Sequence, residues 1–115
     1  MVTGMRKMTN REAEILDRIL EQLPSDREVL REQAARAKVH VIDQEGSLRF
    51  LVADTARPAE HIAERVPVTA ISDDADGMPV YILLHLIAGR LWELEVYKAD
   101  GSPIIDPPAP DKLYF

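Results

Sequence analysis

The 115-residue chain contains no cysteine, which excludes disulfides and thiolate zinc sites and suits a reducing cytoplasm. Aromatic residues make up only 5% of the chain, too few to line a deep sugar-binding cleft. The five glycines form neither a phosphate-binding loop nor a Gly-x-Ser-x-Gly elbow. The sequence therefore predicts no cofactor and no enzymatic activity.

Long apolar runs are also missing. The longest, Val80 to Ala88, is interrupted by His85 and is far too short to span a bilayer. The N-terminal stretch Met1–Leu16 has basic residues but no apolar region directly after them, so we expect no secretory signal. These features predict a cytoplasmic protein that makes no contact with a membrane.

The formal net charge is −6, and it is unevenly distributed. Residues 1–38 hold eight basic and seven acidic side chains, a balance of +1, whereas residues 39–115 hold six and thirteen, a balance of −7. This excess would repel a phosphate backbone, so we expect no nucleic-acid binding. It would attract a basic protein partner, although acidity that merely keeps the protein in solution is the simpler interpretation.

Two capping boxes predict two helices at the start of the chain. Thr9–Glu12 is followed by an apolar stripe at helical spacing, and Pro24 ends that helix near Gln22. Ser25–Glu28 opens a shorter, weaker helix that runs to about Lys38. Helices joined by so short a link form an αα-hairpin or corner. The stripe consists of Ile15, Leu16, Ile19, Leu20 and Leu23.

After Lys38 the apolar pattern becomes that of strands. We expect one α+β domain: helices at about 9–38, a mostly antiparallel, five- to six-stranded β-meander at about 39–105, and an extended Pro-rich tail at 106–115. Residues 55–65 are either a loop or one helical turn. The expected strands are Val39–Asp43, Leu48–Asp54, Val66–Asp73, Met78–Ile87 and Arg90–Lys98, with a short edge segment at Ser102–Ile105.

A two-residue turn at Ala88-Gly89 would fix the register of the last hairpin. His85 would then lie opposite Trp92, while Glu93 and Glu95 would lie on the other face of the sheet. That face must be at least partly hydrated, because burying two unpaired carboxylates costs too much free energy. Leu84 and Ile82, opposite the glutamates, would complete a mixed acidic and apolar patch.

The residue types of metal and acid–base sites occur without the spacing that such sites need. In the acidic segment Asp73–Gly77, the position of the bidentate calcium ligand is occupied by Leu83, so an acidic turn is the better interpretation. The histidines at positions 40, 61 and 85 have no metal-ligand spacing. His85 is interpreted as a partly buried structural residue and His61 as a solvated loop residue.

Glu93 and Glu95 share one strand face, about 7 Å apart by strand rise. Glycosidases place two carboxylates at comparable separations, but the chain lacks the aromatic residues of their clefts. Solvated strand glutamates are the favoured interpretation, followed by a partner-binding patch and then by catalysis.

Several segments resemble the motifs of one family of short bacterial proteins without established function. Arg6–Glu12 resembles its R-K-L-T-x-x-E opening. Asp76–Val80 and Gly89–Tyr97 are similar to its D-G-x-P-φ … G-x-L-x-E-L-E-φ-Y core, in which φ is apolar. Asp100–Ile104 and Pro108–Leu113 match its D-G-x-P-I … P-x-P-x-x-L end. The resemblance covers both ends and the C-terminal half, and at position 92 relatives often carry a small polar residue instead of Trp.

Members of this family resemble immunity proteins encoded beside bacterial toxins, including those of contact-dependent growth inhibition. The resemblance implies a protein that binds a toxin's C-terminal domain, often a nuclease, and blocks it by occlusion. Together with the acidity of residues 39–115, it predicts a patch that mimics phosphates. The expected contact residues are Asp73, Asp74, Asp76, Glu93, Glu95 and Tyr97.

Two alternatives remain open. The first is a small ligand-binding or enzymatic domain that uses Glu93, Glu95 and His85, and it predicts a concave pocket between sheet and tail. The second is a homodimer that buries the second face of the sheet between two copies.

Overall fold

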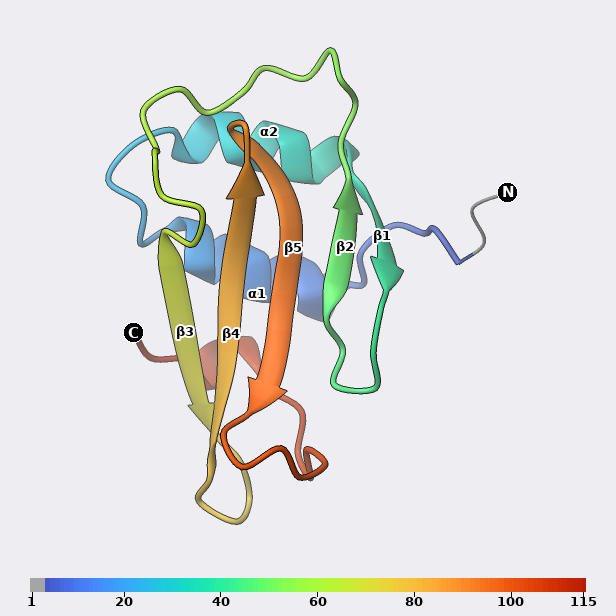
Figure 1. Ribbon diagram of the computed structural model, residues 1–115, viewed down its shortest axis with the longest axis vertical. Coiled ribbons are helices and arrows are strands. Elements are labelled where there is room, and N and C mark those ends of the chain that lie inside the picture. Colours follow the sequence, from blue (N-terminus) through green and yellow to red (C-terminus); the bar gives the residue numbers. More distant parts are fainter. Residues whose placement is uncertain (1–3) are drawn as a thin grey trace.

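The structure is a computed structural model that describes residues 4–115; residues 1–3 of the N-terminal stretch, where we expect no signal, lie outside the described residues. Two helices lie behind one five-stranded antiparallel sheet (Figure 1), which confirms the predicted α+β class. No helix among residues 4–115 is long and apolar enough to cross a membrane. The elements are α1 (Asn10–Leu20), α2 (Arg27–Arg36), β1 (Lys38–Val41), β2 (Leu48–Leu51), β3 (Val68–Asp73), β4 (Pro79–Ile87), β5 (Arg90–Lys98) and the 3-10 turn η1 (Pro110–Lys112).

The first capping box forms as predicted at the start of α1. The Thr9 hydroxyl accepts from the Glu12 amide at 3.2 Å, and the Glu12 carboxylate accepts from the Thr9 amide at 2.9 Å. Arg6 donates to both oxygens of the same carboxylate, at 2.7 and 2.9 Å. The Arg6 guanidinium is the main reason why the pKa of Glu12 lies below its usual value. The predicted apolar stripe of α1 is buried against the sheet.

The second capping box was predicted wrongly. The N-cap of α2 is Asp26, not Ser25, and Asp26 has a left-handed backbone with φ 59°. Its carboxylate accepts from the backbone amide of His61 at 2.7 Å and lies 3.1 Å from the His61 ring nitrogen Nδ1. The Asp26 side chain therefore ties the start of α2 to a distant loop, and it raises the pKa of His61. The helix also ends at Arg36, two residues earlier than expected.

The strand order is β1-β2-β5-β4-β3, so the sheet departs from a simple meander. β1 and β2 form one hairpin, β3, β4 and β5 form a meander, and β2 pairs with β5. Residues 52–67 form a long loop that carries the chain over the end of the sheet to its far edge (Figure 1). Hence residues 55–65 adopt the loop rather than the helical alternative. β4 lies inside the sheet, as its apolar residues on both faces predicted.

The C-terminal tail packs against both layers. Residues 102–105 lie outside the strands, contrary to the expected edge segment. Arg11 and Arg18 of α1 donate to the carbonyls of Pro108 and Pro110. Tyr114 then pairs with Ile71 at the outer edge of β3. The tail therefore covers the backbone of an edge strand that would otherwise be open to pairing with another chain.

One hydrophobic core lies between the helices and the sheet. Side chains alternate along β4 between buried and half-buried positions, which is the pattern of a strand covered on one face only. The largest apolar side chains with under 2% exposure are Leu16, Ile19, Leu20, Leu30, Leu48, Ile82, Leu84 and Leu91, together with Val39 and Val80.

A buried polar residue, Gln33 of α2, holds the end of the β4–β5 hairpin. Its side-chain nitrogen donates to the carbonyls of Arg57 and Gly89 at 2.9 and 3.0 Å. Its side-chain oxygen accepts from the Leu91 amide at 3.0 Å. Gln33 is only 3% exposed, so the buried Leu91 amide depends on it instead of on water.

Replacing Gln33 by leucine is expected to lower the free energy of unfolding by about 1–3 kcal/mol, because the buried Leu91 amide loses its acceptor. Urea unfolding followed by circular dichroism measures this loss. Glu32→Gln, an exposed change on the same helix, is the control and should stay within about 0.5 kcal/mol of the parent protein. Equal stabilities for the two variants would contradict this role of Gln33.

Candidate functional site

The face of the sheet turned away from the helices, here called the open face, holds a mixture of charged and aromatic side chains. Strand register and alternating burial assign its members. They include Lys38, His40, Arg49, Leu51, Thr69, Ile71, Asp73, Tyr81, Leu83, His85, Glu93, Glu95 and Tyr97, together with the bulged Trp92 beneath Arg49. Glu93 and Glu95 are half-buried there, which agrees with the expectation that their face is partly hydrated.

A β-bulge decides which residues meet on this face. Ala88 and Gly89 form the predicted turn, with φ values of 52° and 74°, and Ile87 lies opposite Arg90 as expected. Between Leu86 and His85 the register shifts by one residue, so that His85 lies opposite Glu93 and not Trp92. The predicted pairing beyond the turn was therefore wrong. The bulge turns both glutamates onto the face of the imidazole, as bulges do beside many functional sites.

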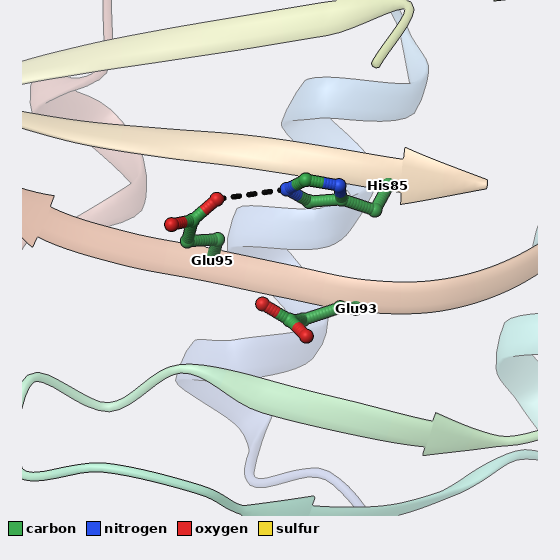
Figure 2. Close-up of side chains that lie close together, drawn as sticks. All are labelled: His85, Glu93 and Glu95. Carbon is green, nitrogen blue, oxygen red and sulfur yellow. Dashed lines mark hydrogen bonds and ion pairs between the residues drawn. The ribbon is translucent and has the colours of Figure 1, made fainter. Parts of the chain in front are cut away.

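His85, Glu93 and Glu95 form a compact cluster at the centre of the open face (Figure 2). One ligand atom from each residue lies within 4.8 Å of the other two. His85 Nε2 is 2.8 Å from a carboxylate oxygen of Glu95. The exposed fractions of the three side chains are 15%, 20% and 39% for His85, Glu93 and Glu95. The cluster is thus held by two neighbouring strands and stays accessible from solvent.

Arg49 of β2 extends the cluster across a third strand. Its Nη2 atom donates to Glu93 Oε1 at 3.2 Å, and the two residues are paired in register. Its guanidinium carbon lies 4.2 Å from the ring centroid of Trp92, in cation–π contact. Arg49 therefore orients one carboxylate and fixes the bulged tryptophan at the same time.

Two tyrosines border the cluster on the side of the β3–β4 turn. Tyr81 and Tyr97 are paired in register, with ring centroids 5.3 Å apart and ring planes tilted by 32°. Tyr97 is 41% exposed. The open face therefore joins an aromatic region to a charged one, which is the composition that interface hot spots favour.

Asp74, expected in the contact patch, is buried, and its carboxylate is fully paired with groups of the protein itself. Its side chain is fully shielded and makes an ion pair of 2.8 Å with Lys98, which is 1% exposed. It also accepts from the amides of Ala75, Ile105 and Asp106. These amide bonds, the one from Ile105 foremost, and the Lys98 ammonium hold the pKa of Asp74 far below its usual value. Asp74 stabilises the loop ends instead of facing a partner.

The other acidic residues of this turn stay at the surface. Asp76 accepts from Lys98 at 2.7 Å and keeps 39% of its side chain exposed. Asp73 is exposed at the end of β3 and accepts from the Tyr114 hydroxyl at 2.8 Å. This segment is the acidic hairpin turn between β3 and β4 that the sequence predicted. Its carboxylates of Asp74 and Asp76 are arranged around the Lys98 ammonium.

Two hollows that border the tail and the long loop lie away from the His85 cluster. A cavity of about 180 Å³ between α1, the tail and the sheet is lined on the sheet side by Ile82, Leu94 and Val96, which belong to the helix-covered face. A second, of about 250 Å³, lies between α2 and the long loop. The hollow beside the tail is therefore on the opposite side of the sheet from Glu93, Glu95 and His85.

Fold and site together define a small two-layer α+β protein with a half-buried His–Glu–Glu cluster on its uncovered sheet face. A family model described as "Domain of unknown function (DUF6984)" matches residues 5–108. The chain belongs to this family, and the match begins just ahead of the capping box of α1 and ends in the first part of the tail. No curated protein and no solved structure matches the chain.

Three residues that organise the site were absent from the sequence-based expectations. Gln33 was interpreted only as a helix position, although a glutamine within an apolar stripe is a signal for a buried polar contact. Ser47 is fully buried, and its hydroxyl accepts from the Val96 amide at 2.8 Å and donates to the Val96 carbonyl at 3.2 Å. Lys98 follows Leu94 and Val96 at two-residue spacing along β5, and this position on the core side of the strand marks it as inward-facing.

Proposed function

We propose that this protein is an immunity-type binding protein of the cytoplasm, which docks a basic toxin domain on the open face of its sheet and blocks it by occlusion. The observation that carries the proposal is the uncovered central sheet, with Arg49, Trp92, Tyr81 and Tyr97 around the two glutamates. Tyrosine, tryptophan and arginine contribute a large share of the binding free energy in protein interfaces.

Charge complementarity supports a basic partner. Residues 39–115, which form all of the sheet except Lys38 together with its loops and the tail, have a formal charge of −7. One of their six basic residues, Lys98, is buried in an ion pair with the equally buried Asp74, so the two charges cancel and the remaining groups keep the balance of −7. A domain that binds nucleic acid carries the opposite charge, and long-range attraction would speed the encounter. This fits the nuclease toxins that the sequence resemblance implies.

The contact patch that we propose differs in part from the set expected from the sequence. Asp74 leaves it, because its carboxylate is buried and fully paired. Asp73, Asp76, Glu93, Glu95 and Tyr97 stay in it, since all five reach the surface. Neighbouring side chains that share the open face join them: Arg49, Tyr81, His85 and Trp92.

An enzymatic role for Glu93, Glu95 and His85 has less support. Such a role needs a pocket that excludes water around the reacting groups. The hollow beside the tail lies on the other face of the sheet. The three side chains occupy a surface that suits docking better than the enclosure of a small molecule.

The test is co-expression with the protein encoded by the neighbouring gene. Cells that produce the protein encoded by the neighbouring gene should grow only when the immunity-type protein is also present. The two proteins should form a 1:1 complex. Glu93→Lys/Glu95→Lys should slow association at least roughly tenfold at low salt and weaken its dependence on salt.

The matched control is Glu14→Lys/Glu21→Lys, which makes the same change of charge at exposed positions of the helix layer. Its association rate should fall much less. Full protection and unchanged association for the sheet-face variant, with correct folding verified by circular dichroism, would refute the assigned surface.

A further inference from the structure

We infer that His85, Glu93 and Glu95 form a binding site for a divalent transition-metal ion, with Zn²⁺ as the best-fitting probe. The inference concerns the protein alone and is independent of the proposed toxin binding. It depends on the donor set, on the distances between the donors and on the way that the sheet holds them.

The donor set suits zinc. Zn²⁺ binds imidazole nitrogen and carboxylate oxygen at about 2.0–2.2 Å, which places tetrahedral ligands about 3.4 Å apart. The three ligand atoms here lie within 4.8 Å of one another, and the His85–Glu95 pair is already at 2.8 Å. Small side-chain rotations therefore bring all three donors to one ion, without any change in the strands.

The sheet holds the ligands in place before an ion arrives. The bulge at Trp92 sets Glu93 opposite His85, and Glu95 follows two residues later on the same face (Figure 2). Arg49 holds one oxygen of Glu93 at 3.2 Å and leaves the second oxygen for a metal. Such a hydrogen bond to a coordinating carboxylate orients it, as the outer contacts of metal sites commonly do.

The geometry also sets limits on the affinity. Three protein ligands on one side leave the fourth position open to water, as in catalytic and partner-bridged zinc sites rather than closed structural ones. Coordination through Nε2 moves the ring proton to Nδ1, which is buried and has no hydrogen-bond partner among residues 4–115. Protons and metal compete for Nε2 as well. We therefore expect weaker binding than in closed four-ligand sites, and weaker still at acidic pH.

The experiment is calorimetric titration of the untagged protein with Zn²⁺ at about pH 7.5. One ion per chain should bind, and Glu95→Gln and His85→Gln should each weaken binding more than tenfold. Asp73→Asn, which removes a carboxylate from the same face outside the cluster, should leave binding unchanged. Co²⁺ should give the visible absorption of a low-coordinate site with the parent protein and lose it with both ligand variants.

Thermal unfolding provides a second test of Zn²⁺ binding that does not depend on the heat of titration. Zn²⁺ should raise the melting temperature of the parent protein and of Asp73→Asn, but not that of folded Glu95→Gln or His85→Gln. Absence of Zn²⁺ binding would overturn the inference. Equal binding of Mg²⁺, or Zn²⁺ binding that survives both ligand substitutions, would also overturn it, because acidic surface charge would then explain the uptake. None of these three results would bear on the proposed partner binding, which the co-expression test measures separately.

Discussion

Gly89→Ala is expected to lower the free energy of unfolding by about 2–5 kcal/mol, the sum of a left-handed backbone penalty and a steric overlap. Gly89 has φ 74°, which an L side chain adopts only with strain. A Cβ atom at this position would lie 2.5 Å from the Ala59 carbonyl oxygen and 2.8 Å from the Ala59 amide nitrogen. Both are backbone atoms, so the long loop itself would have to move.

Gly101→Ala separates the two contributions. Gly101 has nearly the same φ, 76°, but a Cβ atom there would meet no atom within 4 Å. Gly101→Ala should therefore lower the free energy of unfolding only by the left-handed backbone penalty, about 1–2 kcal/mol. Urea unfolding of both variants measures the difference. Equal losses would mean that the long loop does not pack tightly on the hairpin turn, and the close contact between Gly89 and Ala59 would be wrong.

Asp74→Asn is expected to lower the melting temperature by roughly 10 °C, because it leaves the Lys98 ammonium buried with half of its counter-charge. Asp76→Asn is the matched control: it removes the other carboxylate that contacts Lys98, but one that is 39% exposed. Its effect should be clearly smaller. Differential scanning calorimetry at neutral pH gives both values, and a larger loss for Asp76→Asn would contradict the burial of the Asp74–Lys98 pair.

The same pair predicts how stability changes in acid. Folding lowers the pKa of Asp74 from its ordinary value of 3.8. The stability that this carboxylate contributes is therefore fully present above about pH 5 and is lost as the pH falls below 3.8 towards the folded pKa. A plot of melting temperature against pH should fall less steeply in acid for Asp74→Asn than for the parent protein. Parallel curves would contradict the assignment.

The elements of the fold were predictable because they depend on neighbours in sequence. The capping box at Thr9 and the apolar stripe after it act within α1, and the turn at Ala88-Gly89 follows from two adjacent residues. The second capping box, Ser25–Glu28, failed because the helix begins one residue later, with Asp26 as its N-cap. The Asp26 carboxylate does not cap the helix either, since it accepts from the amide of His61, 35 positions away. A side chain at a helix start loses its capping role when a partner distant in sequence donates to its oxygens.

The arrangement of the site was not predictable in the same way. An unbroken two-residue hairpin places His85 and the glutamates on opposite faces, and only the bulge brings them together. The bulge is held by Gln33, which binds the Leu91 amide, and by the Arg65 carbonyl, which accepts from the Leu86 amide at 2.7 Å. Both contacts come from segments far away in the sequence. Local sequence patterns therefore predicted the strands that carry the three residues, but not the bulge that brings their side chains together.

Hydroxyl-radical footprinting of the protein, free and in complex with the protein encoded by the neighbouring gene, tests most directly whether the open face is the working surface. The method reports the exposure of side chains by their oxidation. We predict that Trp92, Tyr81 and Tyr97 become protected in the complex, while Met8 beside the helices and His61 in the long loop keep their reactivity. Protection of Met8 and His61 with unchanged oxidation of the three aromatic residues would show that the helix layer binds the partner and would contradict the account.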